Sequence, residues 1–137
     1  MRLLLITCVA ASVAAATAAA TNPVSATMTT SSTKPLVNVP WRYTITVKSQ
    51  AGHPLAARAR LQVLRGTHLV GCWRRTAIVR CTRPEVGTWI PFTGRRTRGA
   101  ILWPKRWVGL ELTFRAVVVT GTHVLLLRAP VTVRSTP

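Results

Sequence analysis

Two cysteines, Cys72 and Cys81, frame the stretch GCWRRTAIVRC and are the first candidates for chemistry. A structural zinc site usually takes its ligands from close pairs, whereas the histidines of this chain are scattered over separate turns. Redox catalysis usually relies on a C-x-x-C pair at a helix N-terminus, which this spacing does not provide. The start of the chain predicts export to an oxidising compartment, where two thiols tend to be joined. We therefore expect a Cys72–Cys81 disulfide and no metal.

The same cysteines predict a hairpin if they face each other across two strands. In that register Trp73 lies opposite Arg80, and residues 75–78 form a four-residue loop. Opposed residues of a non-hydrogen-bonded antiparallel pair lie within about 5 Å, which suits a disulfide. Closing a loop of this size should stabilise the fold by roughly 3 kcal/mol. The loop contains no Gly, Asn, Asp or Pro, so turn chemistry does not support the hairpin.

Arginine and tryptophan gather in GRRTRGAILWPKRW, residues 94–107. Guanidinium groups clamp phosphates and aromatic faces stack on bases or sugars, so this segment, expected as a loop, is a candidate polyanion site. Its candidate residues are Arg95, Arg96, Arg98, Trp103, Lys105, Arg106 and Trp107. The alternative, which we favour for Trp89 and for both tryptophans of this segment, is that the rings lie in the core while the arginines coat outer faces.

Groups for catalysis are scarce. An acid–base hydrolase needs paired carboxyl groups, but the only acidic residues are Glu85 and Glu111, and the alternation of its strand points Glu111 outward. The sequence contains no nucleophile elbow and no Gly-rich phosphate loop. We therefore expect no enzyme activity, no cofactor and no small-molecule substrate.

The chain has 137 residues and a formal net charge of +17, from 19 Lys and Arg against 2 acidic residues. Its length suits one domain with a two-layer core. The excess of arginine has two readings, and both stay open. It can reflect a GC-rich coding sequence, or selection for a polyanionic partner such as nucleic acid, an acidic wall polymer or anionic lipid. A cell-surface component is the other partner considered.

Residues 1–20 have the pattern of a secretory signal peptide, with a basic residue, an apolar run and an A-x-A pattern ending at Ala20. We expect cleavage after Ala20, with Ala26 as a second candidate, and a secreted or cell-surface protein. The alternative is an uncleaved membrane anchor, which the alanine-rich second half and the lack of a following basic cluster disfavour. Residues 21–36, half of them Ser or Thr, are interpreted as an extended spacer.

From residue 37 onward the sequence predicts strand after strand. WRYTITVK, ARARLQV and LELTFRAVV alternate apolar and polar residues with the period of two that is typical of half-buried strands. TGTH then turns the chain into VLLLRAPVTV, a predicted hairpin whose Pro130 belongs at a sheet edge or a bulge. This pattern predicts an all-β domain over residues 37–135, with two antiparallel sheets packed face to face.

WRYTITVKSQAGHPLAARARLQVL resembles the first two strands of bacterial immunoglobulin-like or fibronectin-III-like modules, and LTFRAVVVTGTHVLLLRAPVTVR resembles their last hairpin. This resemblance implies an immunoglobulin-like antiparallel β-sandwich of about seven strands after a signal helix, and a structural or adhesive role. The chain departs from antibody-type domains, because the nearby Cys72 and Cys81 cannot form their long-range disulfide between the sheets. We expect a secreted non-catalytic module, with a secreted polyanion binder as the alternative.

Overall fold

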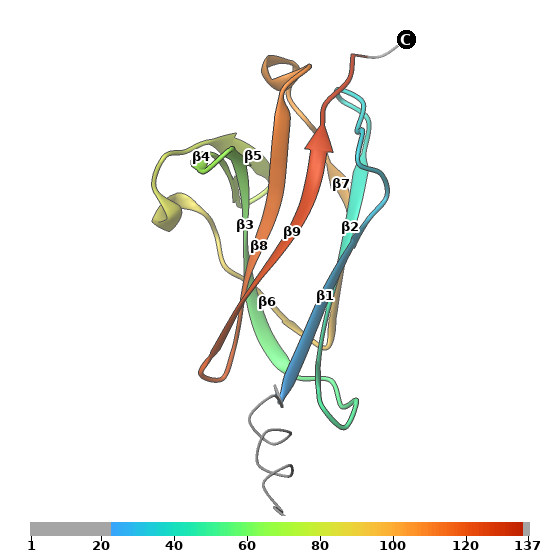
Figure 1. Cartoon of the computed structure of the whole chain (residues 1–137), viewed down its shortest axis with the longest axis vertical. Coiled ribbons are helices and arrows are strands. Elements are labelled where there is room, and N and C mark those ends of the chain that lie inside the picture. Colours follow the sequence, from blue (N-terminus) through green and yellow to red (C-terminus); the bar gives the residue numbers. More distant parts are fainter. Residues whose placement is uncertain (1–22, 136–137) are drawn as a thin grey trace, which may run out of the picture.

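The structure of the chain is a computed structural model that describes residues 23–135 and, within residues 98–100, the backbone alone. The predicted signal peptide, residues 1–20, lies outside the described residues. The described part is all-β, with antiparallel sheets and no α-helix, as the alternation predicts (Figure 1). It has nine strands, more than the resemblance implies.

The larger sheet has six strands in the order β5-β4-β3-β8-β9, and β6 pairs with the first half of β3. Its members are β3 (Ala56–Arg65), β4 (His68–Arg74), β5 (Ala77–Arg80), β6 (Ile90–Thr93), β8 (Glu111–Thr120) and β9 (His123–Thr132). The prediction for Pro130 is confirmed, because β9 is an edge strand. Thr132 donates its backbone N–H to Thr33 at 2.9 Å, away from β8, so Pro130, which faces the same edge, removes no hydrogen bond from the β8–β9 ladder.

The smaller sheet has three strands in the order β1-β2-β7, which are Val24–Thr30, Trp41–Ser49 and Arg95–Ile101. The expectation of a spacer over residues 21–36 is wrong for β1, which pairs along its whole length with β2. Val24, Ala26 and Met28 turn toward the core while the intervening Ser and Thr stay exposed. Threonine suits strands, so a hydroxyl-rich segment can form one when its other face is apolar. Cleavage after Ala20 keeps β1 whole.

The core lies between the two sheets and is centred on aromatic rings. Trp41, Trp103 and Phe114 are at most 2% exposed. Their rings pack edge to face, with centroids 5.3 Å apart for Trp41 and Trp103 and 5.0 Å apart for Trp41 and Phe114. Because Trp41 belongs to β2 and Phe114 to β8, these contacts join the two sheets.

Candidate functional site

The segment expected as a polyanion-binding loop is a strand followed by a short turn. Residues 95–101 form β7, the edge of the three-stranded sheet, and Lys105–Trp107 form the 3-10 turn η2. Trp103 is 0% exposed and Trp107 is 5% exposed, so neither ring can stack on a ligand. A Cβ at Gly71 would clash with Trp107, which shows how closely the core surrounds that ring. The stacking part of the predicted site is therefore wrong, and the core alternative applies to both rings.

The arginines of β7 do not share one surface. Arg95 is exposed on the outer face, whereas Arg96 lies opposite the buried Ile45 and is half-buried. The Nε of Arg96 has no hydrogen-bond partner among the described residues. The backbone of Arg98 pairs with that of Tyr43. An inward charge on an edge strand discourages pairing with another sheet, so a structural role accounts for Arg96.

Lys105 and Arg106 lie beyond the far end of β7 and are exposed. The guanidinium carbon of Arg106 lies 4.7 Å from the centroid of the Trp107 ring. Burial, and then the charge of Arg80, lowers the pKa of Arg106. Arg106 therefore covers Trp107, and the length of β7 separates Lys105 and Arg106 from Arg95. The predicted residues therefore do not form a single polyanion site.

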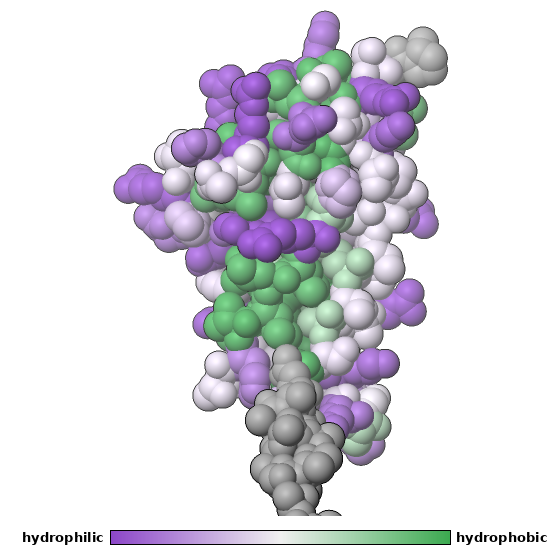
Figure 2. Space-filling view, viewed as in Figure 1, coloured by the Kyte–Doolittle hydropathy of each residue, from purple (hydrophilic) through white to green (hydrophobic). Residues whose placement is uncertain are grey.

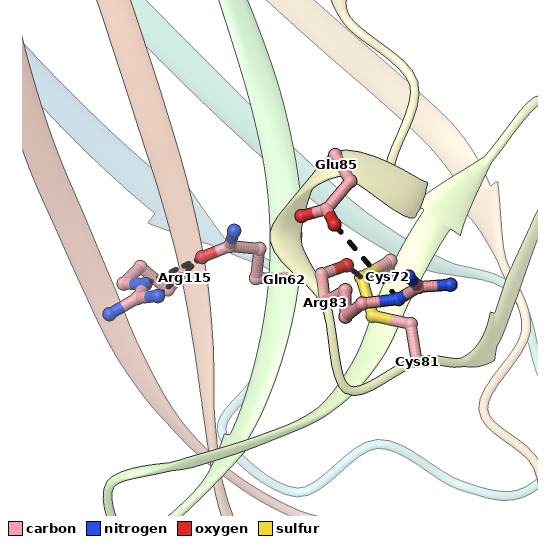
Figure 3. The surroundings of a disulfide bond; sticks show 6 residues. All are labelled: Gln62, Cys72, Cys81, Arg83, Glu85 and Arg115. Atoms are coloured by element: carbon pink, nitrogen blue, oxygen red, sulfur yellow. Dashed lines mark hydrogen bonds and ion pairs between the residues drawn. A yellow bond between two sulfur atoms is a disulfide. The ribbon is translucent and has the colours of Figure 1, made fainter.

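The disulfide between Cys72 and Cys81 forms, but the two residues are not directly opposite each other (Figure 3). Cys72 lies opposite Val79 in the β4–β5 hairpin, and Cys81 follows the end of β5, with the two Cα atoms 5.8 Å apart. The expected register and four-residue loop are therefore wrong. A tighter turn of Arg75 and Thr76 joins the strands, because Arg75 adopts a φ of 59°, in the left-handed region that tight hairpins need. The bond fastens β5 to the sheet, which is a structural role.

Arginines that were not among the candidates line the outer face of the six-stranded sheet. Arg58 and Arg60 of β3 place their guanidinium carbons 4.6 and 4.2 Å from the centroid of the Trp89 ring. The prediction that Trp89 lies in the core is wrong, because the loop after η1 (Pro84–Val86) crosses this outer face and leaves the ring half-buried there. We call the following residues the arginine band: Arg58, Arg60, Arg115 and Arg128.

Arg115 of β8 and Arg128 of β9 lie directly opposite each other. Like charges in this arrangement are destabilising. Burial, and then the charge of Arg128, lowers the pKa of Arg115. Arg115 donates hydrogen bonds to Oε1 of Gln62, from Nε at 2.8 Å and from Nη2 (Figure 3). In the part of the chain that the structure describes, the one ion pair joins Arg83 and Glu85 at 3.9 Å, so no carboxylate neutralises the arginine band.

Aliphatic side chains cover the outer face of the β8–β9 hairpin next to the arginine band. Val124 is 63% exposed and Leu126 is 49% exposed. Figure 2 shows a hydrophobic area on this side of the molecule, bordered by a hydrophilic band. We call the cross-strand pairs Val117–Leu126 and Val119–Val124 the aliphatic patch. A contiguous exposed apolar surface marks an interaction site more reliably than scattered apolar residues do. The unbroken run VLLL in an edge strand is the sequence signal for this patch.

Between residues 23 and 135, no three His, Cys, Asp or Glu side chains come together in a way that could hold a metal ion. Over the same range, no helix is long and apolar enough to cross a bilayer.

Comparison with known proteins gives no relative for this chain: no known protein family matches it, and no curated protein matches its sequence.

Proposed function

We propose that the chain is a secreted, non-catalytic immunoglobulin-like module that acts by contact at the cell surface or outside the cell. The strand order carries this proposal. Variable-type immunoglobulin domains place strands A, B, E and D in one sheet and add C″ and C′ to strands C, F and G in the other. The orders β1-β2-β7 and β5-β4-β3-β8-β9 follow that arrangement. A departure is β6, which pairs with β3 and does not join the smaller sheet.

The path of the chain after β1 also supports this class. β1 pairs with β2, and the next segment crosses to the other sheet, where Pro35 accepts a hydrogen bond from the backbone N–H of Arg134 at 2.8 Å. Tyr43 of β2 and Phe114 of β8 have ring centroids 5.6 Å apart. In antibody domains the corresponding strands B and F are joined by the disulfide between the sheets. In this chain an aromatic contact lies between β2 and β8, and the disulfide lies at an edge of the larger sheet.

The acidic residues support a role without catalysis. Glu85 and Glu111 are both exposed and belong to η1 and β8. Glu85 faces Arg83, and Glu111 lies opposite Thr132 at the start of its strand. Paired carboxyl chemistry needs two such groups around one substrate, and this arrangement does not provide it.

The test uses residues 21–137, which retain every strand and the whole core. On an array of glycans and cell-envelope polymers, this domain should bind one class of component saturably. The double variant Glu85→Gln, Glu111→Gln should bind with the same affinity, because neither carboxyl group belongs to the contact face. A substrate turnover that this double variant abolishes would contradict the proposal and make the chain an enzyme.

The second candidate function is polyanion binding, and the unneutralised arginine band favours it. For this function the binding site lies on the outer face of β3, β8 and β9, and not in residues 95–107 as the sequence predicted. Binding to DNA or heparin should weaken steeply with salt, because each contacted phosphate or sulfate releases counterions.

Two charge-matched variants distinguish these locations. One changes the arginine band to glutamine, and the other changes Arg95, Arg96, Lys105 and Arg106 to glutamine. The first should flatten the dependence of DNA affinity on salt by about 0.9 in log–log slope for each phosphate contact that is lost. The second should affect it less. The reverse result would restore the segment predicted from the sequence, and no retention of the unchanged domain on heparin at about 0.1 M salt would reject polyanion binding.

A further inference from the structure

We propose that the outer face formed by β3, β8 and β9 binds the surface of an anionic lipid bilayer. The arginine band contacts lipid phosphates, and the aliphatic patch contacts the acyl region beneath them. This inference rests on the polyanion-binding candidate function and names its partner class.

The aliphatic patch needs an apolar partner, which a polyanion alone does not supply. Val124 and Leu126 are the most exposed of its members, and both lie on the same face as Arg128. Nucleic acid or a sulfated polymer supplies anions but no aliphatic surface. Stacking on bases is also restricted, because the half-buried ring of Trp89 is covered by Arg58 and Arg60. A bilayer offers both anionic headgroups and an apolar layer, and arginine side chains can reach from the apolar layer to the headgroups.

A second copy of this chain does not fit the same face. The chain carries 19 basic residues against 2 acidic ones. A symmetric pair would bring one arginine band against another, and like charges in a contact oppose association. The partner of this face must therefore be negatively charged.

The pair Arg115–Arg128 favours lipid over a folded acidic protein. These two guanidinium groups lie opposite each other with no carboxylate between them. In a fluid bilayer each group can take its own phosphate, because headgroups move independently and need no fixed register. Each basic side chain near an anionic leaflet adds to the attraction.

The start of the domain lies at the end of the molecule that carries the β8–β9 turn. β1 begins at Val24, and Figure 1 shows this residue's end of the strand near the tip of that hairpin. The aliphatic patch occupies the half of the hairpin next to that tip. The aliphatic patch and the start of the domain therefore lie at the same end of the molecule.

The experiment measures co-sedimentation of residues 21–137 with lipid vesicles, since the leader would bind membranes by itself. Vesicles of equimolar phosphatidylcholine and phosphatidylglycerol should bind the domain at least about tenfold more strongly than pure phosphatidylcholine at about 0.15 M salt. The variant Arg115→Gln, Arg128→Gln should lower partition into the anionic vesicles by about tenfold. Arg95→Gln, on the outer face of the other sheet, should lower it by less than about twofold.

The aliphatic patch has a closely matched control. Leu126 and Leu102 are each 49% exposed, but Leu102 lies outside the patch. Leu126→Ser should reduce vesicle partition roughly fivefold, and Leu102→Ser should leave it nearly unchanged. Leu126→Ser should also leave retention on heparin unchanged, because heparin has no aliphatic surface. Far-UV circular dichroism verifies that the four variants keep the fold, and all five substitutions fall at exposed or half-buried positions.

Each other outcome has a definite meaning. Binding to heparin without a preference for anionic vesicles would overturn the lipid proposal and leave polyanion binding in place. Binding to neither would remove both. If Leu126→Ser left vesicle partition unchanged, the proposed role of the aliphatic patch would be overturned. If, in addition, an acidic peptide of alternating Glu and Leu were bound in a Leu126-dependent way, the face would belong to an acidic protein partner.

Discussion

The two outer faces of the sandwich are made from the same alternating strands but carry different chemistry. On the smaller sheet the outward residues are mainly Ser and Thr, and Thr44 and Thr97 share a hydrogen bond of 3.1 Å between their hydroxyl groups. On the larger sheet the outward residues of β3, β8 and β9 form the arginine band and the aliphatic patch. Two outward cations of the smaller sheet lie opposite hydroxyl residues, Lys48 opposite Ser25 and Arg95 opposite Thr46. The other face sets Arg115 opposite Arg128 and leaves aliphatic groups exposed. This difference is why we propose the outer face of the larger sheet as the interaction surface.

The largest expected effect tests whether both faces belong to one cooperative unit. Trp103 is buried between the sheets, so Trp103→Ala should lower the free energy of unfolding by about 3–5 kcal/mol. The denaturant unfolding curves recorded by circular dichroism and by fluorescence should both shift to lower denaturant concentration, and by the same amount. Trp89→Ala, which removes a half-buried ring from the outer face, should cost only about 1 kcal/mol. Equal losses for the two variants would contradict the placement of these rings.

The next largest effect concerns the edge of the larger sheet, whose disulfide should contribute to stability but not to binding. Replacing both Cys72 and Cys81 by serine should lower the free energy of unfolding by roughly 3 kcal/mol, because the unfolded chain is no longer constrained by the closed loop. Binding by Arg115 and Arg128 should persist, because β8 and β9 keep their own ladder and Cys81 lies at the opposite edge of the sheet. Mass spectrometry with and without reductant verifies the bond in the unchanged protein. If the double serine variant were less stable but reductant did not affect the unchanged protein, the loss would come from packing of the cysteines and not from the bond.

The smallest effect has the opposite sign and compares the two faces directly. Arg128→Glu converts the Arg115–Arg128 pair into an opposite-charge pair and should raise the free energy of unfolding by about 0.5–1 kcal/mol. Arg95→Glu changes the net charge equally but lies opposite Thr46, so its effect should be near zero. Urea titrations at low salt measure the difference, which should shrink as salt is added. Equal stabilisation by both variants would mean that overall charge, and not this pair, is responsible.

Much of the fold could be predicted from the sequence, because apolar residues at every second position mark the buried face of a strand. Trp41, Tyr43, Ile45 and Val47 are all buried, as their period of two predicts, and the β8–β9 hairpin lies where two alternating runs flank TGTH. β1 escaped prediction because Ser and Thr dominate it, although Val24, Ala26 and Met28 carry the same period.

The candidate site was harder to predict because it depends on which strands become neighbours. Arg115 and Arg128 are ordinary outward residues in sequence, and only the β8–β9 register places them opposite each other. The cluster of arginine and tryptophan in residues 94–107 was the more conspicuous signal, but bulky indoles fill cores, and Trp103 lies there. The tight turn at Arg75 required a left-handed backbone at a residue that sequence preferences do not mark.

The pairing of the chain's beginning with its end has a consequence for the order of folding. Residues 33 and 35 accept hydrogen bonds from residues 132 and 134, so the sandwich cannot close until the last strand is available. Contacts so distant in sequence give a high contact order, which slows folding. A chain exported as proposed would therefore complete its fold only after its C-terminal strand has been translocated.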